Sequence, residues 1–131
     1  MSQENVEIVR EIHERWKLGD FSSVSWAHPE IEFSNPAALD EEVHQGIEAM
    51  AREWARWLRG FEDFRSEALE FFEAGDEVVT INRFSGRGRG SGVPIREIPG
   101  AARFVLRDGK VVQLAIYTDP ERAFEDAGIG R

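Results

Sequence analysis

The clearest fold signal in this chain is the stretch Ala101-Ala-Arg-Phe-Val-Leu-Arg-Asp-Gly-Lys-Val-Val-Gln-Leu-Ala-Ile-Tyr-Thr-Asp119. It contains two runs of β-forming residues, and the dipeptide Asp108-Gly109 between them is typical of a two-residue hairpin turn. The pattern therefore predicts an antiparallel β-hairpin in which Arg107 pairs with Lys110.

A regular register continues from this pair two residues at a time. It predicts one face made of three opposed pairs, namely Val105 with Val112, Arg103 with Leu114, and Ala101 with Ile116. Arg103 is the one charged residue on that face, and a guanidinium held among apolar side chains needs a partner. Arg103 is therefore expected either to hold an anionic ligand or to pair with a core carboxylate such as Glu32 or Glu70.

The opposite face of the predicted hairpin is also largely apolar. With the same register it consists of Ala102, Phe104, Leu106, Val111, Gln113, Ala115 and Tyr117. A sheet that is apolar on both faces must be covered on both. If helices cover one face, the other predicts a homodimer.

Outside this hairpin the sequence predicts helices first and strands later. Apolar residues recur at helical spacing over residues 4–18 and 47–58, and a short closing helix is expected over 120–126 with Asp119 as N-cap. A short helix is also expected over 21–27 and a loop over 36–46. Strands are predicted over residues 30–34, 77–84, 93–106 and 111–118, with Pro94 and Pro99 marking an edge or bulge. This order predicts one α+β domain, residues 1–131, with helices on one face of a curved, mostly antiparallel sheet.

The composition excludes several classes of function. A net charge of −9 argues against binding to a nucleic-acid backbone, and the absence of cysteine excludes disulfides and thiolate chemistry. His13, His28 and His44 lack metal-ligand spacing, so no metal and no cofactor are expected. The polar N-terminus and the lack of a long apolar run predict a cytoplasmic protein without a membrane anchor.

Several short motifs, in this order, resemble SnoaL-like proteins of the nuclear-transport-factor-2-like superfamily. They are Trp16-Lys-Leu-Gly-Asp20, His28-Pro-Glu-Ile-Glu-Phe33 leading to Asn35-Pro36, Gly46-Ile-Glu-Ala-Met50, Glu73-Ala-Gly-Asp76, Gly86-Arg-Gly-Arg-Gly-Ser-Gly92 and Arg107-Asp-Gly-Lys110. The resemblance implies a cone: a curved sheet that wraps the helices and encloses a pocket. Members of this family include enzymes and binding modules, so fold alone does not assign function.

The resemblance also implies that the known catalytic groups are missing. Asn35 falls where isomerase-like members carry their basic carboxylate, and an amide cannot act as a general base. Their supporting tyrosine and acid fall on Ile12 and Ala101. Relatives of the epoxide-hydrolase type share the asparagine but have tyrosine in place of Phe33, and cyclase-like members place a histidine at Ala102.

The sequence thus leaves three hypotheses. The first is a domain that binds a small apolar or anionic organic molecule in a pocket polarised by Arg103. The second is a cyclase, isomerase or hydrolase with an atypical acid–base site using His13 or Asp119, and the third is a dimerisation module whose cone is filled by its own tryptophans. The candidate pocket residues are Arg103, Asn35, His13, Trp16, Phe33, Trp54, Trp57, Leu114 and Ile116.

Overall fold

The computed structural model describes residues 2–129, except for the side chains of residues 2, 40 and 41. Its helices are α1 (Ser2–Lys17), α2 (Ile47–Leu58) and α3 (Pro120–Ala127), with a 3-10 turn η1 (Pro36–Ala38). Its strands are β1 (Ala27–Asn35), β2 (Asp40–Gln45), β3 (Phe61–Ala74), β4 (Glu77–Gly88), β5 (Pro94–Arg107) and β6 (Lys110–Tyr117).

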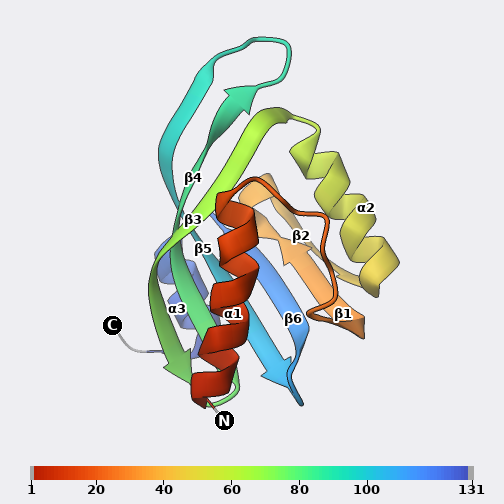
Figure 1. Ribbon diagram of the computed structural model, residues 1–131, viewed down its shortest axis with the longest axis vertical. Coiled ribbons are helices and arrows are strands. Elements are labelled where there is room, and N and C mark those ends of the chain that lie inside the picture. Colours follow the sequence, from red (N-terminus) through yellow and green to blue (C-terminus); the bar gives the residue numbers. More distant parts are fainter. Residues whose placement is uncertain (1, 130–131) are drawn as a thin grey trace.

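Within these residues the six strands form one sheet in the order β2-β1-β6-β5-β4-β3. The pair β1–β6 is parallel and the other neighbours are antiparallel. The sheet curves around α1, while α3 lies behind it on the opposite face (Figure 1). The predicted α+β architecture with a curved, mostly antiparallel sheet is confirmed.

The β5–β6 turn has the predicted geometry. Asp108 and Gly109 have φ angles of 51° and 79°, as a type I′ hairpin turn requires, and Arg107 pairs with Lys110. Leu106 then pairs with Val111, but Val105 pairs with Gln113, so Val112 is an extra residue in β6. This β-bulge was not predicted.

The bulge makes the predicted register wrong beyond Leu106. Arg103 lies opposite Ala115 instead of Leu114, because one extra residue moves every later side chain of β6 to the other face. Leu114 and Ile116 therefore join Ala102, Phe104 and Leu106 on the inner face, in the core against α1 and α2. Arg103 lies on the outer face, and the apolar outer surface predicted from the regular register does not exist in that form.

A second, smaller core lies on the outer face under α3. Ala101, Ala115, Tyr117 and Val79 are buried there with Ala123 and Phe124 of α3. Asp119 caps this helix as predicted, since its side chain accepts a hydrogen bond from the backbone N–H of Glu121 at 3.1 Å. Of the surface that the sequence assigned to a dimer partner, Ala115 and Tyr117 are thus covered by the chain's own last helix.

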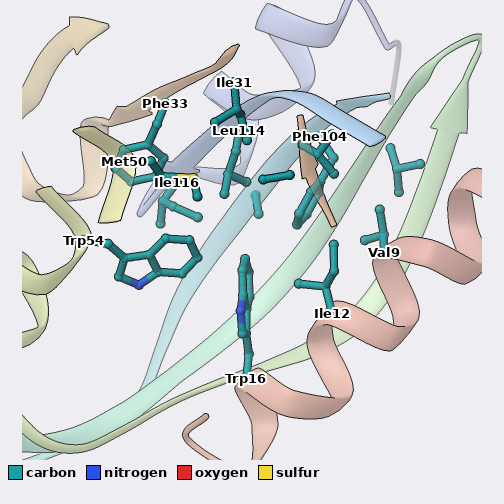
Figure 2. Close-up of a cluster of buried hydrophobic side chains, with 14 of the residues drawn as sticks. Val9, Ile12, Trp16, Ile31, Phe33, Met50, Trp54, Phe104, Leu114 and Ile116 are labelled. Carbon is teal, nitrogen blue, oxygen red and sulfur yellow. The ribbon is translucent and has the colours of Figure 1, made fainter. Parts of the chain in front are cut away.

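Aromatic side chains fill the centre of the cone (Figure 2). Trp16 from α1 meets Trp54 from α2 edge-on, with ring centroids 5.1 Å apart. Phe33 of β1 stacks on Trp54 at 5.7 Å, with the two rings nearly parallel. Phe104 and Phe21 close the cluster at 5.9 Å from Trp16. The interior that the fold encloses is therefore mostly occupied by the protein itself.

Three short segments test predictions made from local sequence. No helix forms over residues 21–27, because Asp20 instead accepts hydrogen bonds from the backbone and hydroxyl of Ser22 in a local turn. The predicted loop 36–46 contains η1 and the edge strand β2. The edge indicated by Pro94 and Pro99 is confirmed: these residues pair only with β4, since β6 ends opposite Ala101.

Candidate functional site

A cavity lies between α2 and the η1–β2 segment. Its volume is about 740 Å³, within the range of small-molecule sites. Its walls are formed by Asn35, Ala38, Glu42, His44, Arg52, Glu53, Arg56, Trp57, Gly60 and Phe61. The α2 residues among them recur every three or four positions and so share one face of the helix. We call this space the α2 cavity.

Asn35 brings a buried amide to the α2 cavity. It is the last residue of β1 and alternates with Ile31 and Phe33, so it points to the inner face, and it is only 3% exposed. Its Oδ1 atom is buried without a hydrogen-bond partner among the residues that the structure describes. Leaving such an acceptor unpaired costs roughly 1–3 kcal/mol. Since this oxygen is closed to solvent, a bound molecule can remove that cost only after the amide turns.

His44 and Glu53 form the polar wall. His44 pairs with Phe33 across β1–β2 and therefore points to the same inner face, toward α2. Its Nε2 atom lies 3.8 Å from Glu53 Oε1, and the two side chains are 16% and 12% exposed. Arg56 donates a hydrogen bond of 3.2 Å to the same Glu53 oxygen, and Arg52 Nε lies 3.8 Å from Oε2. The Glu53 carboxylate thus lies beside two guanidiniums and one imidazole.

Trp57 and Phe61 form the apolar wall, with ring centroids 5.5 Å apart in an edge-to-face arrangement. The β4–β5 hairpin holds this wall in place through Arg89. Its guanidinium donates hydrogen bonds of 2.8 Å to the carbonyls of Arg59 and Phe61, and its backbone N–H bonds to the Gly60 carbonyl at 2.9 Å. The end of α2 and the start of β3 are therefore fixed by a side chain from the turn of a distant hairpin.

His13 lies outside this cavity, in a polar network inside the core. Its Nδ1–H donates to the Val9 carbonyl at 3.0 Å, so Nε2 accepts from Asn82 Nδ2 at 3.0 Å. Asn82 also bonds to Ser66 at 2.7 Å and to Thr80 at 2.6 Å. Burial lowers the pKa of His13 to about 4, against the effect of the Val9 hydrogen bond. Both ring nitrogens are engaged, so the environment of His13 fits a structural neutral imidazole.

Arg103 lies in a separate groove of about 300 Å³ on the outer face, which shares no lining residue with the α2 cavity. Its Nε atom donates to Glu77 Oε1 at 2.6 Å and its NH1 atom to Gln113 at 3.4 Å. The carboxylate partner is thus Glu77 rather than Glu32 or Glu70. Gln113 in turn donates to Glu32 at 3.1 Å. Arg103 therefore cannot polarise the α2 cavity.

The remaining sequence candidates divide into two groups. Asn35 and Trp57 line the α2 cavity, whereas Trp16, Phe33, Trp54, Leu114 and Ile116 are buried in the inner core. The sequence interpretation did not include Arg52, Glu53 and Arg56 among the candidate site residues. Their positions predicted the solvent-exposed face of α2, but all three line the cavity. The available signal was their spacing beside Trp57, which puts a carboxylate between two guanidiniums next to an aromatic ring.

A family model for the SnoaL-like domain matches residues 9–114. The chain belongs to the SnoaL-like family. The match covers all six strands in part or in full, from the second turn of α1 to the middle of β6. No curated protein sequence matches this SnoaL-like domain.

Solved structures share the fold of this SnoaL-like domain. A protein from Jannaschia sp. CCS1 described as a SnoaL-like polyketide cyclase is 20% identical, with a TM-score of 0.77 over 88% of this chain and 85% of its own. TerC, co-crystallised with polyporic acid, is also 20% identical, with a TM-score of 0.75 over 94% and 96%. A protein with a ketosteroid-isomerase-like fold from Catenulispora acidiphila, in complex with trimethylamine, is 17% identical, with a TM-score of 0.71 over 95% and 94%. At these identities the likeness establishes the fold alone.

Among residues 2–129, no group of three or more potential ligand side chains is arranged to hold a metal ion. No helix in the described part of the chain is long and apolar enough to cross a membrane. Ile12 and Ala102, where relatives are expected to carry functional side chains, are core residues here.

Proposed function

We propose that this SnoaL-like domain binds a small organic molecule in the α2 cavity. The observation that carries the proposal is the Asn35 amide, buried at the cavity with an unpartnered carbonyl oxygen. Because an amide can turn by half a rotation, either its oxygen or its amino group can face the bound molecule. Trp57 and Phe61 supply a flat apolar wall beside it.

The properties of related structures support a ligand of this kind. TerC was crystallised with an organic acid, and the Catenulispora protein with a small amine. Because the aromatic cluster around Trp16 and Trp54 fills the centre of the cone, we place such a molecule in the α2 cavity. Binding pockets typically combine apolar walls with a few polar groups that orient the ligand, as this cavity does.

A thermal-shift screen tests the proposal. Wild-type protein and the Asn35→Leu variant are compared with a panel of hydroxylated aromatic compounds, both neutral and anionic. We expect at least one compound to raise the melting temperature of the wild type and to lose that effect in the variant. Panel compounds that leave the wild type unshifted, or that shift both proteins equally, contradict binding at Asn35.

A second candidate function is acid–base catalysis in the same cavity, and the contact between His44 and Glu53 favours it. A histidine beside a carboxylate is a common arrangement for moving protons. His13 and Asp119, the earlier candidates, are engaged in the core network and in the cap of α3. The test is deuterium exchange into a bound ketone: wild type should exchange the proton next to the carbonyl for deuterium faster than His44→Gln. Equal rates in both proteins exclude this role for His44.

We also propose that the domain forms a homodimer through the outer face near β2. Leu39 and Val43 are 92% and 59% exposed, and Val43 borders the groove that contains Arg103 and Gln113. Apolar side chains this exposed are stabilised by a partner surface. Sedimentation should show a wild-type dimer and a Val43→Glu monomer. A wild type that stays monomeric at high concentration contradicts the dimer.

A further inference from the structure

We infer that the molecule bound in the α2 cavity is an aromatic carboxylate whose anionic group contacts Arg52 and Arg56. This inference rests on the proposed function, because it names the ligand class of the same cavity. It transfers to α2 the anion-binding role that the sequence assigned to Arg103, a residue already paired with Glu77 on the outer face.

The charge arrangement on α2 provides the first argument. Arg52 and Arg56 are one helical turn apart, both line the cavity, and their ion pairs within residues 2–129 all go to Glu53. Two guanidiniums therefore share one carboxylate. The Arg52–Glu53 separation of 3.8 Å is an ion-pair distance and not a hydrogen bond. Since a guanidinium carries five N–H donors, most of the donors on these side chains remain available for a second anion.

The position of the guanidiniums provides the second argument. Arg52 and Arg56 are 69% and 74% exposed, whereas Glu53 between them is only 12% exposed. The partly buried carboxylate holds the two arginines at the cavity, while most of each guanidinium side chain stays exposed. A planar carboxylate entering there matches the fork of donors on each guanidinium. Glu42 lines the cavity from β2, which favours the α2 side for a negatively charged group.

The apolar wall specifies the rest of the ligand. Trp57 lies on the same face of α2 as Arg56 and Glu53, and Phe61 follows it across Gly60. A flat ring placed against these two side chains shares the cavity with the Asn35 amide and with both arginines. A hydroxyl group on the ring satisfies the amide, because it both donates and accepts hydrogen bonds. The cavity thus fits a hydroxylated aromatic carboxylate.

Isothermal titration with matched probes tests this inference. The probes are 4-hydroxybenzoate and the longer 4-hydroxycinnamate, each compared with its neutral methyl ester. We expect wild type to bind at least one acid about threefold more tightly than its ester, since solvent weakens a charge-assisted contact to largely exposed arginines. The difference should shrink as ionic strength rises.

Three variants locate the anion site. Arg52→Gln and Arg56→Gln should each remove most of the preference for the acid over the ester. Arg59→Gln is the matched control: it makes the same charge change at the C-cap of α2, outside the cavity wall. It should leave the preference unchanged. All three side chains are largely exposed, so the variants are expected to fold.

The outcomes separate this inference from the proposed function. Equal binding of acid and ester by wild type overturns the carboxylate assignment and leaves small-molecule binding intact. A loss in Arg59→Gln as large as in Arg52→Gln and Arg56→Gln overturns it too, because the effect would then be general surface charge. If neither these probes nor any compound of the screening panel binds wild type, both proposals fail.

Discussion

The guanidinium of Arg89 donates a hydrogen bond to the Phe61 carbonyl and so ties the tip of the β4–β5 hairpin to the wall of the α2 cavity. Figure 1 shows this hairpin extending past the end of α2. The same side chain also bonds to the Arg59 carbonyl at the end of α2, where carbonyls lack partners within the helix. A residue distant in sequence thus controls the position of Phe61 and Gly60.

Replacing Arg89 with Gln should weaken ligand binding more than it weakens the fold. The loss of these bonds should cost about 1 kcal/mol of unfolding free energy, because the site is exposed. Ligand affinity should fall as well, since Phe61 loses its fixed position. Arg87→Gln is the control: Arg87 lies on the same hairpin and pairs with Asp63 at 2.7 Å, away from the cavity wall. Urea unfolding measures the stability of both variants, and ligand titration measures their affinities. Equal affinities in the two variants would contradict this view.

Two buried asparagines should respond in opposite ways to replacement with Leu. Asn35→Leu removes an amide whose oxygen has no partner, so stability should be unchanged or raised while ligand binding is lost. Asn82→Leu leaves His13, Ser66 and Thr80 without their shared partner, and should cost about 3 kcal/mol or more. Thermal unfolding of both variants measures the two changes in stability. A large loss of stability in Asn35→Leu would indicate a structural amide.

The stability of the protein should fall between pH 6.5 and pH 4 because of His13. Its pKa is lowered from 6.5 in the unfolded chain to about 4 in the folded state. In that interval the unfolded state binds the proton and the folded state does not, so acid favours unfolding. The stabilising contribution of neutral His13 is fully present above pH 6.5. Roughly 3 kcal/mol of unfolding free energy is lost by pH 4.

Chemical denaturation at several pH values measures this dependence for wild type and for His13→Gln. Gln keeps a polar group in the network but does not titrate in this range. The slope of unfolding free energy against pH should therefore be shallower in the variant. Identical slopes would mean that His13 is not held neutral by burial.

Gly100→Ala should destabilise the protein by about 1–3 kcal/mol. A Cβ atom at this position would lie 2.3–2.9 Å from three ring atoms of Phe84, which packs directly over the Gly100 backbone. Phe84 is 4% exposed and belongs to the inner core, so its ring has little room to move. A lower melting temperature is expected, and an unchanged one would show that the ring relaxes freely.

Arg103→Met should lower stability without affecting ligand binding. Arg103 and Glu77 are 20% and 24% exposed and make a hydrogen-bonded ion pair, so its loss should cost about 1 kcal/mol or more. A double-mutant cycle with Glu77→Gln measures the coupling between the two groups. Any effect of Arg103→Met on the ligand-induced thermal shift would contradict the assignment of binding to the α2 cavity.

Much of the fold follows from local sequence. The helix over 47–58, the Asp108-Gly109 turn and the Asp119 cap are confirmed at the predicted residues. Periodicity, turn dipeptides and capping residues act within a few positions along the chain. The helix predicted over 21–27 was wrong, because a turn around Asp20 and Ser22 competes locally with helix formation.

The site was less predictable. Asn35 and Trp57 were expected near a pocket and do line the α2 cavity. The groups that complete it come from separate elements, with His44 on β2 and Arg56 on α2. Their proximity depends on the packing of α2 against the β1–β2 hairpin, which local patterns do not encode.

Sequence alone determined the α+β class, the hairpin turn and the presence of the cation Arg103 within the otherwise apolar run 101–106. Tertiary structure decided which face that cation occupies. The single extra residue Val112 reverses the sides of β6 relative to β5, so Arg103 pairs with Glu77 outside the cone. Side chains alternate with a period of two in a strand, and one bulge therefore exchanges the core and the outer face. The same packing filled the centre of the cone with aromatic side chains and left a cavity beside α2.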